Sequence, residues 1–245
     1  QAAHLIRLGE LERCVVVGPV AHLSPMAIQA FDAIGALGGH DYADKPEQAS
    51  RPFDNDRNGF IYGQASGALI LESLSSCEKR QRPPLGYIGG AGIFLDATTS
   101  PGPSADGEAQ AMRRAMDSAQ IEAADIDTIN AHATASHAGD TAELEAIHSV
   151  FGESAKGLCV QATKGLIGHT LWAAGVIESV AVLIQMQQSF RHPNLNLASP
   201  MRDDVGFAPA IATEGAPQIV LSNSFGFGGI NTSIVITKSR ERNSP

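Results

Sequence analysis

Hydrophobic positions along the chain alternate between short β-branched runs and longer stretches with helical spacing. In residues 25–37, for example, Ile28, Phe31 and Ile34 recur at every third position, which predicts a helix with one apolar face. Strands are expected at residues 14–17, 60–62, 68–71, 87–94, 126–131, 158–162, 219–223 and 232–237. Further helices are expected at residues 1–9, 73–79, 108–119, 140–151 and 168–188. Because strands alternate with helices, this pattern predicts an α/β layered fold.

The helix expected at residues 168–188 is apolar on almost every side, with Glu178 as its one interruption. A helix of this kind cannot face water on any side, so we expect it to lie between two layers. Residues 38–59 form a long polar stretch, and loops of that length in compact domains often serve a function. Residues 98–107 predict a second loop, rich in Pro, Ser and Gly.

The composition is that of a globular protein with a sizeable core. Of the 245 residues, 43% are hydrophobic, which suits one large domain or two small ones. The Arg-Pro-Pro segment at residues 82–84 is the best boundary between them. The domain count stays open, and a division of the chain would separate residues 1–82 from residues 83–245.

The charge balance narrows the possible partners. The chain has 17 Lys and Arg against 26 Asp and Glu, a formal net charge of −9, which argues against nucleic acid or an anionic membrane as a partner. No apolar run is long enough to span a bilayer, and residues 1–10 lack the order of a signal peptide. The three cysteines form no disulfide framework and have no metal-ligand spacing. A cytoplasmic protein without a metal site is predicted.

Two histidines stand where a ligand site is expected. His132 directly follows the strand predicted at residues 126–131, and ligands of α/β folds bind at the carboxyl ends of strands. His169 stands at the predicted start of the apolar helix, where the helix dipole favours a neutral imidazole that can donate a hydrogen bond to an oxyanion. Lys164 lies five residues earlier. A backbone-bonded histidine, an ordinary first-turn histidine and a solvated lysine are the alternative interpretations.

Two further segments qualify this hypothesis. Asp140 and Glu143 match a capping box with Asp140 as the N-cap, so Glu143 could do no more than cap a helix. The glycine-rich loop at residues 226–229 precedes a strand instead of opening a helix, so it is not a phosphate cradle; it is a loop that must bend sharply or move. Together these residues predict a site of two imidazoles, one ammonium and a mobile aromatic loop.

Four segments resemble motifs of the β-ketoacyl synthases, the condensing enzymes of fatty-acid and polyketide synthesis. The similar segments are residues 130–134 (Asn-Ala-His-Ala-Thr), residues 164–169 with 173–175, residues 223–231, and residues 51–54 with Arg57, Gly59 and Phe60. The resemblance implies a thiolase-like α/β fold with layers in the order αβαβα, of which this chain would hold the end of the first half and the whole second half. In that family a nucleophilic cysteine would precede residue 1, and none of Cys14, Cys77 and Cys159 replaces it.

The resemblance also implies roles for individual residues. His132 and His169 would donate hydrogen bonds to an enolate, and Lys164, paired with Glu143, would support the site electrostatically. The substrate-binding residues implied are Thr134 and Ser136 on the pantetheine arm, Phe227 as a gate for acyl chains, and Phe225 and Trp172 beside the acyl pocket. No bound cofactor is implied, because the phosphopantetheine arm of an acyl carrier protein delivers the malonyl and acyl thioesters.

Three departures from the family pattern concern substrate binding. Ala133 and Trp172 stand where glycine is usual, and residues 135–137 replace a Ser-Thr-Pro-like run. The bulk of Trp172 predicts a short or absent acyl chain, or a reshaped pocket. Docking of an acidic carrier protein to this acidic chain requires a local basic patch, for which the candidates are Arg51, Arg57 and Arg191.

Three functions remain open on these residues. The first is a chain-extending synthase with its cysteine upstream, and the second is a malonyl carrier-protein decarboxylase. The third is a non-catalytic partner subunit, against which the retention of both histidines argues. A thiolase-like degradative enzyme would need a second cysteine near the glycine loop, where this chain has Ser224. A homodimer or a ketosynthase heterodimer is expected.

Overall fold

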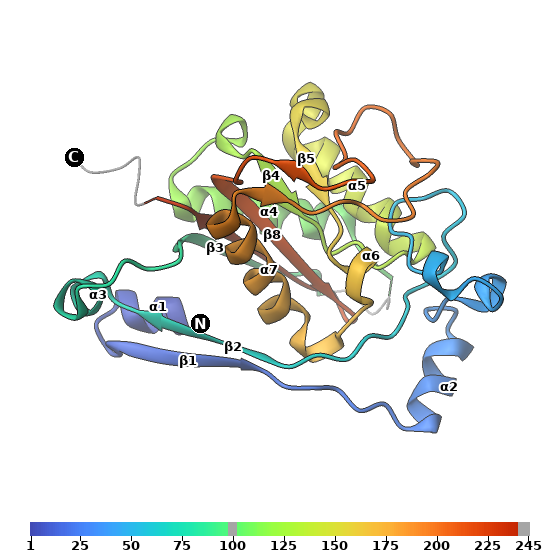
Figure 1. Ribbon diagram of the computed structural model, residues 1–245, viewed down its shortest axis with the longest axis horizontal. Helices are drawn as coiled ribbons and strands as arrows, with labels where there is room; N and C mark the ends of the chain where they lie inside the picture. The colour runs from blue at the N-terminus through green and yellow to red at the C-terminus, as the bar shows by residue number, and fades with distance from the viewer. Residues whose placement is uncertain (98–101, 240–245) are drawn as a thin grey trace.

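The computed structural model describes residues 1–97 and 102–239, in which a helix separates a large β-sheet from a smaller one (Figure 1). The larger sheet has five strands in the order β3-β9-β8-β4-β5, and the smaller one pairs β1 with β2. The strands are β1 (Arg13–Gly18), β2 (Gly67–Glu72), β3 (Tyr87–Leu95), β4 (Thr128–Asn130), β5 (Cys159–Gln161), β8 (Ile219–Gly226) and β9 (Ile230–Thr237), with the small pair β6 (Phe190–Arg191) and β7 (Thr213–Glu214). The helices are α1 (Ala2–Arg7), α2 (Pro25–Ala33), α3 (Leu74–Arg80), α4 (Ala105–Ala119), α5 (His137–Phe151), α6 (Lys164–Ile167) and α7 (Ala174–Gln188).

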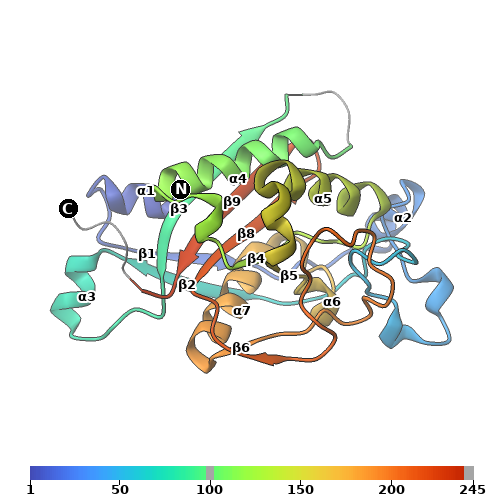
Figure 2. The same cartoon turned by 90° about the horizontal axis from the view of Figure 1, so that it is seen from above.

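The layered α/β fold is confirmed. Helices α4 and α5 cover one face of the five-stranded sheet, and α7 lies on the other face, between this sheet and the β1–β2 pair (Figures 1 and 2). Gly92 of β3 lets α4 approach so closely that an added Cβ would lie 2.1 Å from the Ala111 carbonyl oxygen. On the opposite side, Gly18 packs against Val176 of α7. The nearly all-apolar helix therefore does lie between two layers, as its sequence predicts.

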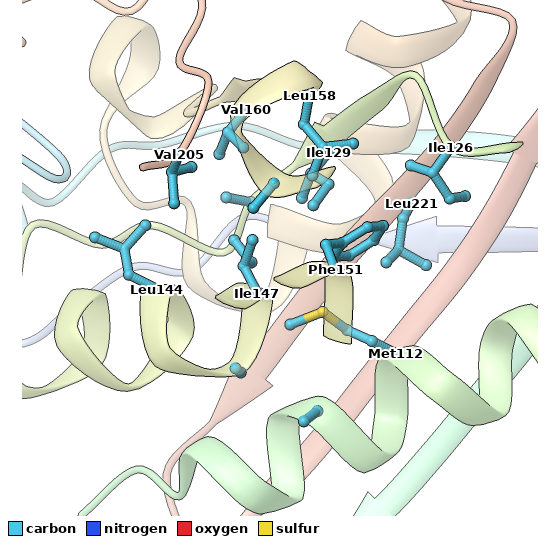
Figure 3. Close-up of a cluster of buried hydrophobic side chains, with 14 of the residues drawn as sticks. Met112, Ile126, Ile129, Leu144, Ile147, Phe151, Leu158, Val160, Val205 and Leu221 are labelled. Carbon is cyan, nitrogen blue, oxygen red and sulfur yellow. The ribbon is translucent and has the colours of Figure 1, made fainter. Parts of the chain in front are cut away.

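The main hydrophobic core fills the space between α4, α5 and the sheet (Figure 3). Met112 of α4, Ile147 of α5 and Ile129 of β4 are completely buried. Within β4, all three residues are buried, as expected for a central strand paired in parallel on both sides. This core fixes the carboxyl ends of β4 and β5 relative to α5.

Several helices and strands differ from those predicted from the sequence. Helix α5 begins at His137, capped by the Ser136 hydroxyl, and not at Asp140. Residues 60–62 form isolated bridges instead of a strand, because Tyr62 pairs with His169 and Phe60 with Leu37. Of the loop predicted at residues 98–107, positions 98–101 lie outside the described residues. Among the described helices, none combines the length and the apolar character needed to cross a bilayer.

The helix predicted at residues 168–188 is broken near its start. Helix α6 ends at Ile167, a short 3₁₀ turn covers Leu171–Ala173, and α7 begins only at Ala174. Gly168 and Leu171 adopt positive φ angles of 71° and 52°, which an α-helix does not allow. The break also places the His169 amide on the Ile61 carbonyl, at 2.7 Å. His169 therefore lies in a connecting segment and not at a helix N-terminus.

Candidate active site

Three neighbouring strands deliver side chains to the same edge of the large sheet. Strand β4 runs parallel to β5 and to β8. Beyond their carboxyl ends come His132 after β4 and Lys164 after β5, while Phe225 lies near the end of β8. Its ring centroid is 5.9 Å from that of His132. These residues therefore lie at the carboxyl ends of the strands, where ligands of α/β folds bind, as predicted from the sequence.

The two histidines predicted from the sequence meet at this edge. Their ring centroids lie 5.5 Å apart, and the ring planes are nearly perpendicular, at 84°. Burial, followed by the charge of Lys164, lowers the pKa of His132 well below its ordinary value. The same two causes lower the pKa of His169 to about 3. Both imidazoles are therefore neutral at physiological pH.

The contacts of each ring fix the position of its proton. The Leu171 backbone N–H donates to Nδ1 of His169 at 3.2 Å. Nδ1 of His132 lies 3.4 Å from the Lys164 ammonium, which can only donate. Since each Nδ1 faces a donor, the single proton of each neutral ring lies on Nε2. Two Nε2–H donors result, which is the arrangement that stabilises an oxyanion.

Lys164 is buried, with 2% of its surface exposed, and it pairs with Glu178 of α7. Its ammonium also donates to the His132 carbonyl at 2.5 Å. The expected pairing with Glu143 is wrong, since it is the α7 carboxylate that lies within hydrogen-bond distance of the ammonium. Sequence reasoning missed Glu178 as a site residue. The sequence does carry a signal for this role: Glu178 is a lone carboxylate in an apolar helix, and a buried charge requires a partner.

Glu143 instead holds the backbone that follows β4. Its two oxygens accept the N–H groups of His132 at 2.8 Å and Ala133 at 2.7 Å. The Asn223 amide donates to the same carboxylate at 3.1 Å. Burial raises the pKa of Glu143, and these hydrogen bonds with the charge of Lys164 oppose the rise. Glu143 does not cap α5; it positions the His132 segment.

Asp140 holds the next part of the same segment. Its carboxylate accepts the N–H of Ala135 at 3.0 Å and the N–H of Phe53 at 2.6 Å. It is therefore not the N-cap predicted from the sequence. Ala133 and Ala135 have positive φ angles of 39° and 69°, a region that favours glycine, so these carboxylates hold the segment in a strained form.

The hydroxyls implied to bind pantetheine already contact each other. Thr134 Oγ1 donates to Ser136 Oγ at 2.9 Å, and Ser136 Oγ accepts the Gly139 N–H at 3.2 Å. Ser136 thus caps α5, a structural role that the sequence analysis did not assign to it. Both side chains are half-buried, so their role toward substrate stays a prediction.

The aromatic residues differ in burial. Phe225 is buried beside His132, whereas Phe227 lies in the exposed turn between β8 and β9, with its ring 6.2 Å from that of Phe31. Trp172 is 70% exposed, on the turn before α7. Its predicted place beside an acyl pocket stays a prediction.

Phe60 was not predicted as a site residue, although its ring lies 5.3 Å from that of His169.

The basic docking patch expected from three arginines is wrong for two of them. Arg51 and Arg57 are buried, at 8% and 7% exposure, because they hold the polar loop in place. Arg51 pairs with Asp54 at 3.0 Å, and Arg57 donates to the Asp54 carbonyl at 3.1 Å. Arg191 pairs with Asp127 at 3.1 Å. The guanidinium groups of Arg51 and Arg57 are therefore not free to bind a carrier protein, whereas Arg191, whose side chain is 22% exposed, stays a predicted contact.

Two family models match the chain in succession. The first is described as "Beta-ketoacyl synthase, N-terminal domain" and matches residues 1–76. The second, "Beta-ketoacyl synthase, C-terminal domain", matches residues 85–198. The resemblance found in the sequence motifs is confirmed by both.

Curated relatives carry two kinds of name. The "Polyketide biosynthesis malonyl-ACP decarboxylase PksF" of Bacillus subtilis is 40% identical over 228 residues, covering 93% of this chain and 54% of that protein. The "3-oxoacyl-[acyl-carrier-protein] synthase 2" of Rhizobium meliloti is 37% identical over 240 residues, covering 97% of this chain and 56% of that protein. The chain thus spans little more than half the length of these relatives.

Solved ketosynthases share the fold. A type II polyketide ketosynthase, solved with its acyl carrier protein and a hexaketide, has a TM-score of 0.91 at 31% identity, covering 96% of this chain and 58% of that one. A β-ketoacyl synthase from Burkholderia phymatum has a TM-score of 0.90 at 31% identity, covering 98% and 58%. The thiolase-like layered fold is therefore confirmed.

Proposed function

The chain belongs to the β-ketoacyl synthase family, and we propose that its site decarboxylates a malonyl thioester and directs the resulting enolate into chain extension. The observation that carries this proposal is the pair of neutral imidazoles, each with a donor at Nδ1 and its own proton on Nε2. Two such donors at one edge of the sheet fit an enolate oxygen. A single oxyanion donor contributes about 10²- to 10³-fold to the rate.

The chemistry balances without a bound cofactor. The bond between the malonyl carboxylate and the α-carbon breaks, carbon dioxide leaves, and the electron pair moves onto the thioester oxygen as an enolate. His132 and His169 hydrogen-bond that oxygen through Nε2 and remain neutral. The buried Lys164 ammonium adds positive charge beside His132. The enolate carbon then attacks an acyl thioester on a cysteine, forming the new carbon–carbon bond as the thiolate leaves.

The cysteine of this extending reaction would be supplied from outside the chain described here. Cys14 lies in β1, Cys77 in α3 and Cys159 at the amino end of β5, away from the carboxyl-end edge that carries the imidazoles. We therefore place the nucleophile on a segment preceding residue 1, in keeping with relatives of nearly twice this length. On the same grounds, residues 1–82 would be the end of the first half of the fold and residues 83–245 the second half.

An acyl carrier protein is the proposed partner, and its phosphopantetheine arm would bring in the substrate. A structural neighbour bound to its carrier protein supports this assignment. Thr134 and Ser136 are the proposed contacts of that arm, with Phe225, Phe227 and Trp172 beside the acyl group. A homodimer or a ketosynthase heterodimer is the proposed assembly, and the cytoplasm the proposed compartment.

A second function is favoured by one comparison. The 40% identical relative is named a malonyl-ACP decarboxylase, and decarboxylation requires both imidazoles but no cysteine. In that case the enolate carbon takes a proton, and acetyl carrier protein is released. A non-catalytic partner subunit would explain neither the two oriented imidazoles nor the buried lysine beside His132.

Product analysis separates these functions. The full-length protein is mixed with malonyl carrier protein, with and without an acyl-loaded carrier, and the mass of each carrier is followed. Extension predicts a β-ketoacyl carrier that forms only when the acyl carrier is present. Accumulation of acetyl carrier regardless of acyl carrier supports the decarboxylase. Unchanged malonyl carrier in both mixtures contradicts both functions.

A further inference from the structure

A buried amide and a buried hydroxyl stand among the side chains that β8 and β9 turn toward α5. Side chains alternate along a strand, so Leu221, Asn223 and Phe225 share the face of β8 that packs against the main core. Asn223 pairs directly with Ser233 of β9, and their side chains therefore lie side by side on this face. Polar groups buried in this way require partners within the protein.

The two side chains hydrogen-bond to each other and to Glu143 of α5. Ser233 Oγ donates to Asn223 Oδ1 at 2.8 Å, and Asn223 Nδ2 donates to Glu143 Oε1 at 3.1 Å. Asn223 is 0% exposed and the other two residues are each 1% exposed, so water does not compete for these bonds. Both links from β9 to α5 are thus direct hydrogen bonds between buried side chains.

The chemistry of each group fixes how the Asn223 amide points. In the described part of the chain, each hydrogen bond of the Glu143 carboxyl comes from a donor, as an ionised carboxylate requires. With its oxygen on Ser233, the amide presents its NH₂ group to that carboxylate. The reversed amide would place Oδ1 against Glu143 Oε1, which brings two acceptors into contact. The Ser233 hydroxyl therefore stabilises the orientation that binds Glu143.

Glu143 transmits this constraint to the backbone at the site. Its Oε1, which accepts from Asn223, also accepts the His132 N–H, and its Oε2 accepts the Ala133 N–H. Ala133 has a positive φ of 39°, so this backbone must be held in place. Among the described residues, Asn223 is the only side chain that donates to the carboxylate. It joins the carboxylate to β8, whereas the other two donors belong to the segment that is being held.

We propose that Asn223 is a positioning residue: locked by Ser233, it fixes the Glu143 carboxylate and thereby the place of the His132 imidazole. The inference rests on the proposed function for its kinetic consequence only. Without the amide, the carboxylate can turn and the His132 N–H follows it, which moves Nε2–H away from the oxygen that it would bind. The tautomer is not altered, because Nδ1 still faces the Lys164 ammonium.

Two variants remove the connection at different points. Asn223→Leu keeps the size of the side chain and loses the donor to Glu143, whereas Ser233→Ala loses only the hydroxyl. In the full-length protein, kcat for malonyl carrier decarboxylation is expected to fall roughly tenfold in Asn223→Leu and about threefold in Ser233→Ala, with KM unchanged. The double variant is expected to match Asn223→Leu in kcat but to unfold at a higher temperature, because it no longer buries an unpaired Ser233 hydroxyl.

Thr232→Val is the matched control. Thr232 neighbours Ser233 and, by strand alternation, points to the opposite face, and its hydroxyl donates to the Ser224 carbonyl at 2.9 Å. The variant removes one hydroxyl bond between the same two strands, and kcat is expected to stay at the wild-type value. A loss of kcat equal to that in Ser233→Ala would overturn the positioning role, because both losses would then reflect the stability of the strand pair.

A second readout does not depend on turnover. With ¹⁵N-labelled histidine, the backbone amide resonance of His132 is expected to shift in Asn223→Leu and Ser233→Ala and to keep its wild-type position in Thr232→Val. That pattern in a protein that does not decarboxylate malonyl carrier would support the positioning role and contradict the proposed function. A resonance that is unmoved in Asn223→Leu, or in Ser233→Ala where Asn223→Leu does not fold, would overturn the positioning role.

Discussion

The Leu171 backbone N–H lies 3.2 Å from Nδ1 of His169, and this one contact determines which face of the imidazole can serve chemistry. The contact exists because the chain breaks between α6 and α7, where Leu171 adopts a φ of 52°. An unbroken helix would have used that N–H internally. The break in the helix predicted at residues 168–188 therefore orients the His169 imidazole.

The tautomers can be observed directly. Since both rings have lowered pKa values, His132 and His169 are expected to be neutral Nε2–H tautomers in ¹⁵N spectra at pH 7. On acidification a buried neutral histidine loses folding stability as the pH falls from the ordinary value of 6.5 toward the lowered one. The decarboxylation rate should accordingly show no imidazole inflection near pH 6.5. An inflection there, or Nδ1–H signals from either ring, would contradict the assignment.

The partner of Lys164 can be tested through stability. Glu178→Gln leaves a buried ammonium without its counter-charge and is expected to lower the free energy of unfolding by about 3–5 kcal/mol. Adding Lys164→Met should recover much of that loss, which gives a large coupling energy in a double-mutant cycle measured by urea unfolding. The matched cycle of Lys164→Met with Glu143→Gln should give a smaller coupling. A larger coupling between Lys164 and Glu143 would instead support the pair expected from the family resemblance.

The strained segment after β4 offers a stabilising substitution. Ala135 has a φ of 69° and is completely buried, so Ala135→Gly is expected to raise the free energy of unfolding by about 1 kcal/mol. The control is Ala146→Gly in the middle of α5, where glycine should instead cost about 1 kcal/mol. Thermal unfolding of the two variants should shift in opposite directions; a loss of stability in both would mean that the Ala135 strain is absent.

Glu108 of α4 should make stability fall as the pH rises. The carboxyl is 1% exposed and one of its oxygens has no hydrogen-bond partner, and burial followed by Glu143 raises its pKa to about 10. Between the ordinary pKa of 4.5 and about 10, the unfolded chain ionises while the folded one does not, so up to about 1.4 kcal/mol is lost per pH unit.

Glu108→Gln removes this dependence. The variant is therefore expected to unfold at a higher temperature than the wild type, with the difference growing from pH 5 to pH 8. Thermal scans across this interval measure it. A difference that stays constant with pH would show that Glu108 is ionised in the folded protein.

Trp172 tests the width of the acyl site. Because an indole stands where the family usually has glycine, Trp172→Gly is expected to widen the range of acyl chain lengths accepted in the extension assay. An unchanged chain-length profile in competition between short and long acyl carriers would contradict this role. Because the Trp172 side chain is exposed, its removal is expected to leave the stability of the fold near that of the wild type, which thermal unfolding checks.

The sequence predicts the fold and the positions of His132 and Lys164 because both follow strands whose hydrophobic pattern is clear. It does not predict how the connecting segments turn. The roles of Glu143 and Asp140 depend on positive φ angles at Ala133 and Ala135, which spacing alone does not reveal. Glu178 reaches the site because α7 lies between the layers, a relationship that forms only in three dimensions.

We propose that His132 and His169 together stabilise the enolate formed when malonyl carrier protein loses carbon dioxide. This role is tested by the release of carbon dioxide from malonyl carrier labelled in its free carboxyl, measured with the full-length protein and with His132→Ala and His169→Ala. We expect release by the wild type and a loss of about 10²- to 10³-fold in each variant, with the fold retained. Release that is absent in the wild type, or unchanged in both variants, would contradict it.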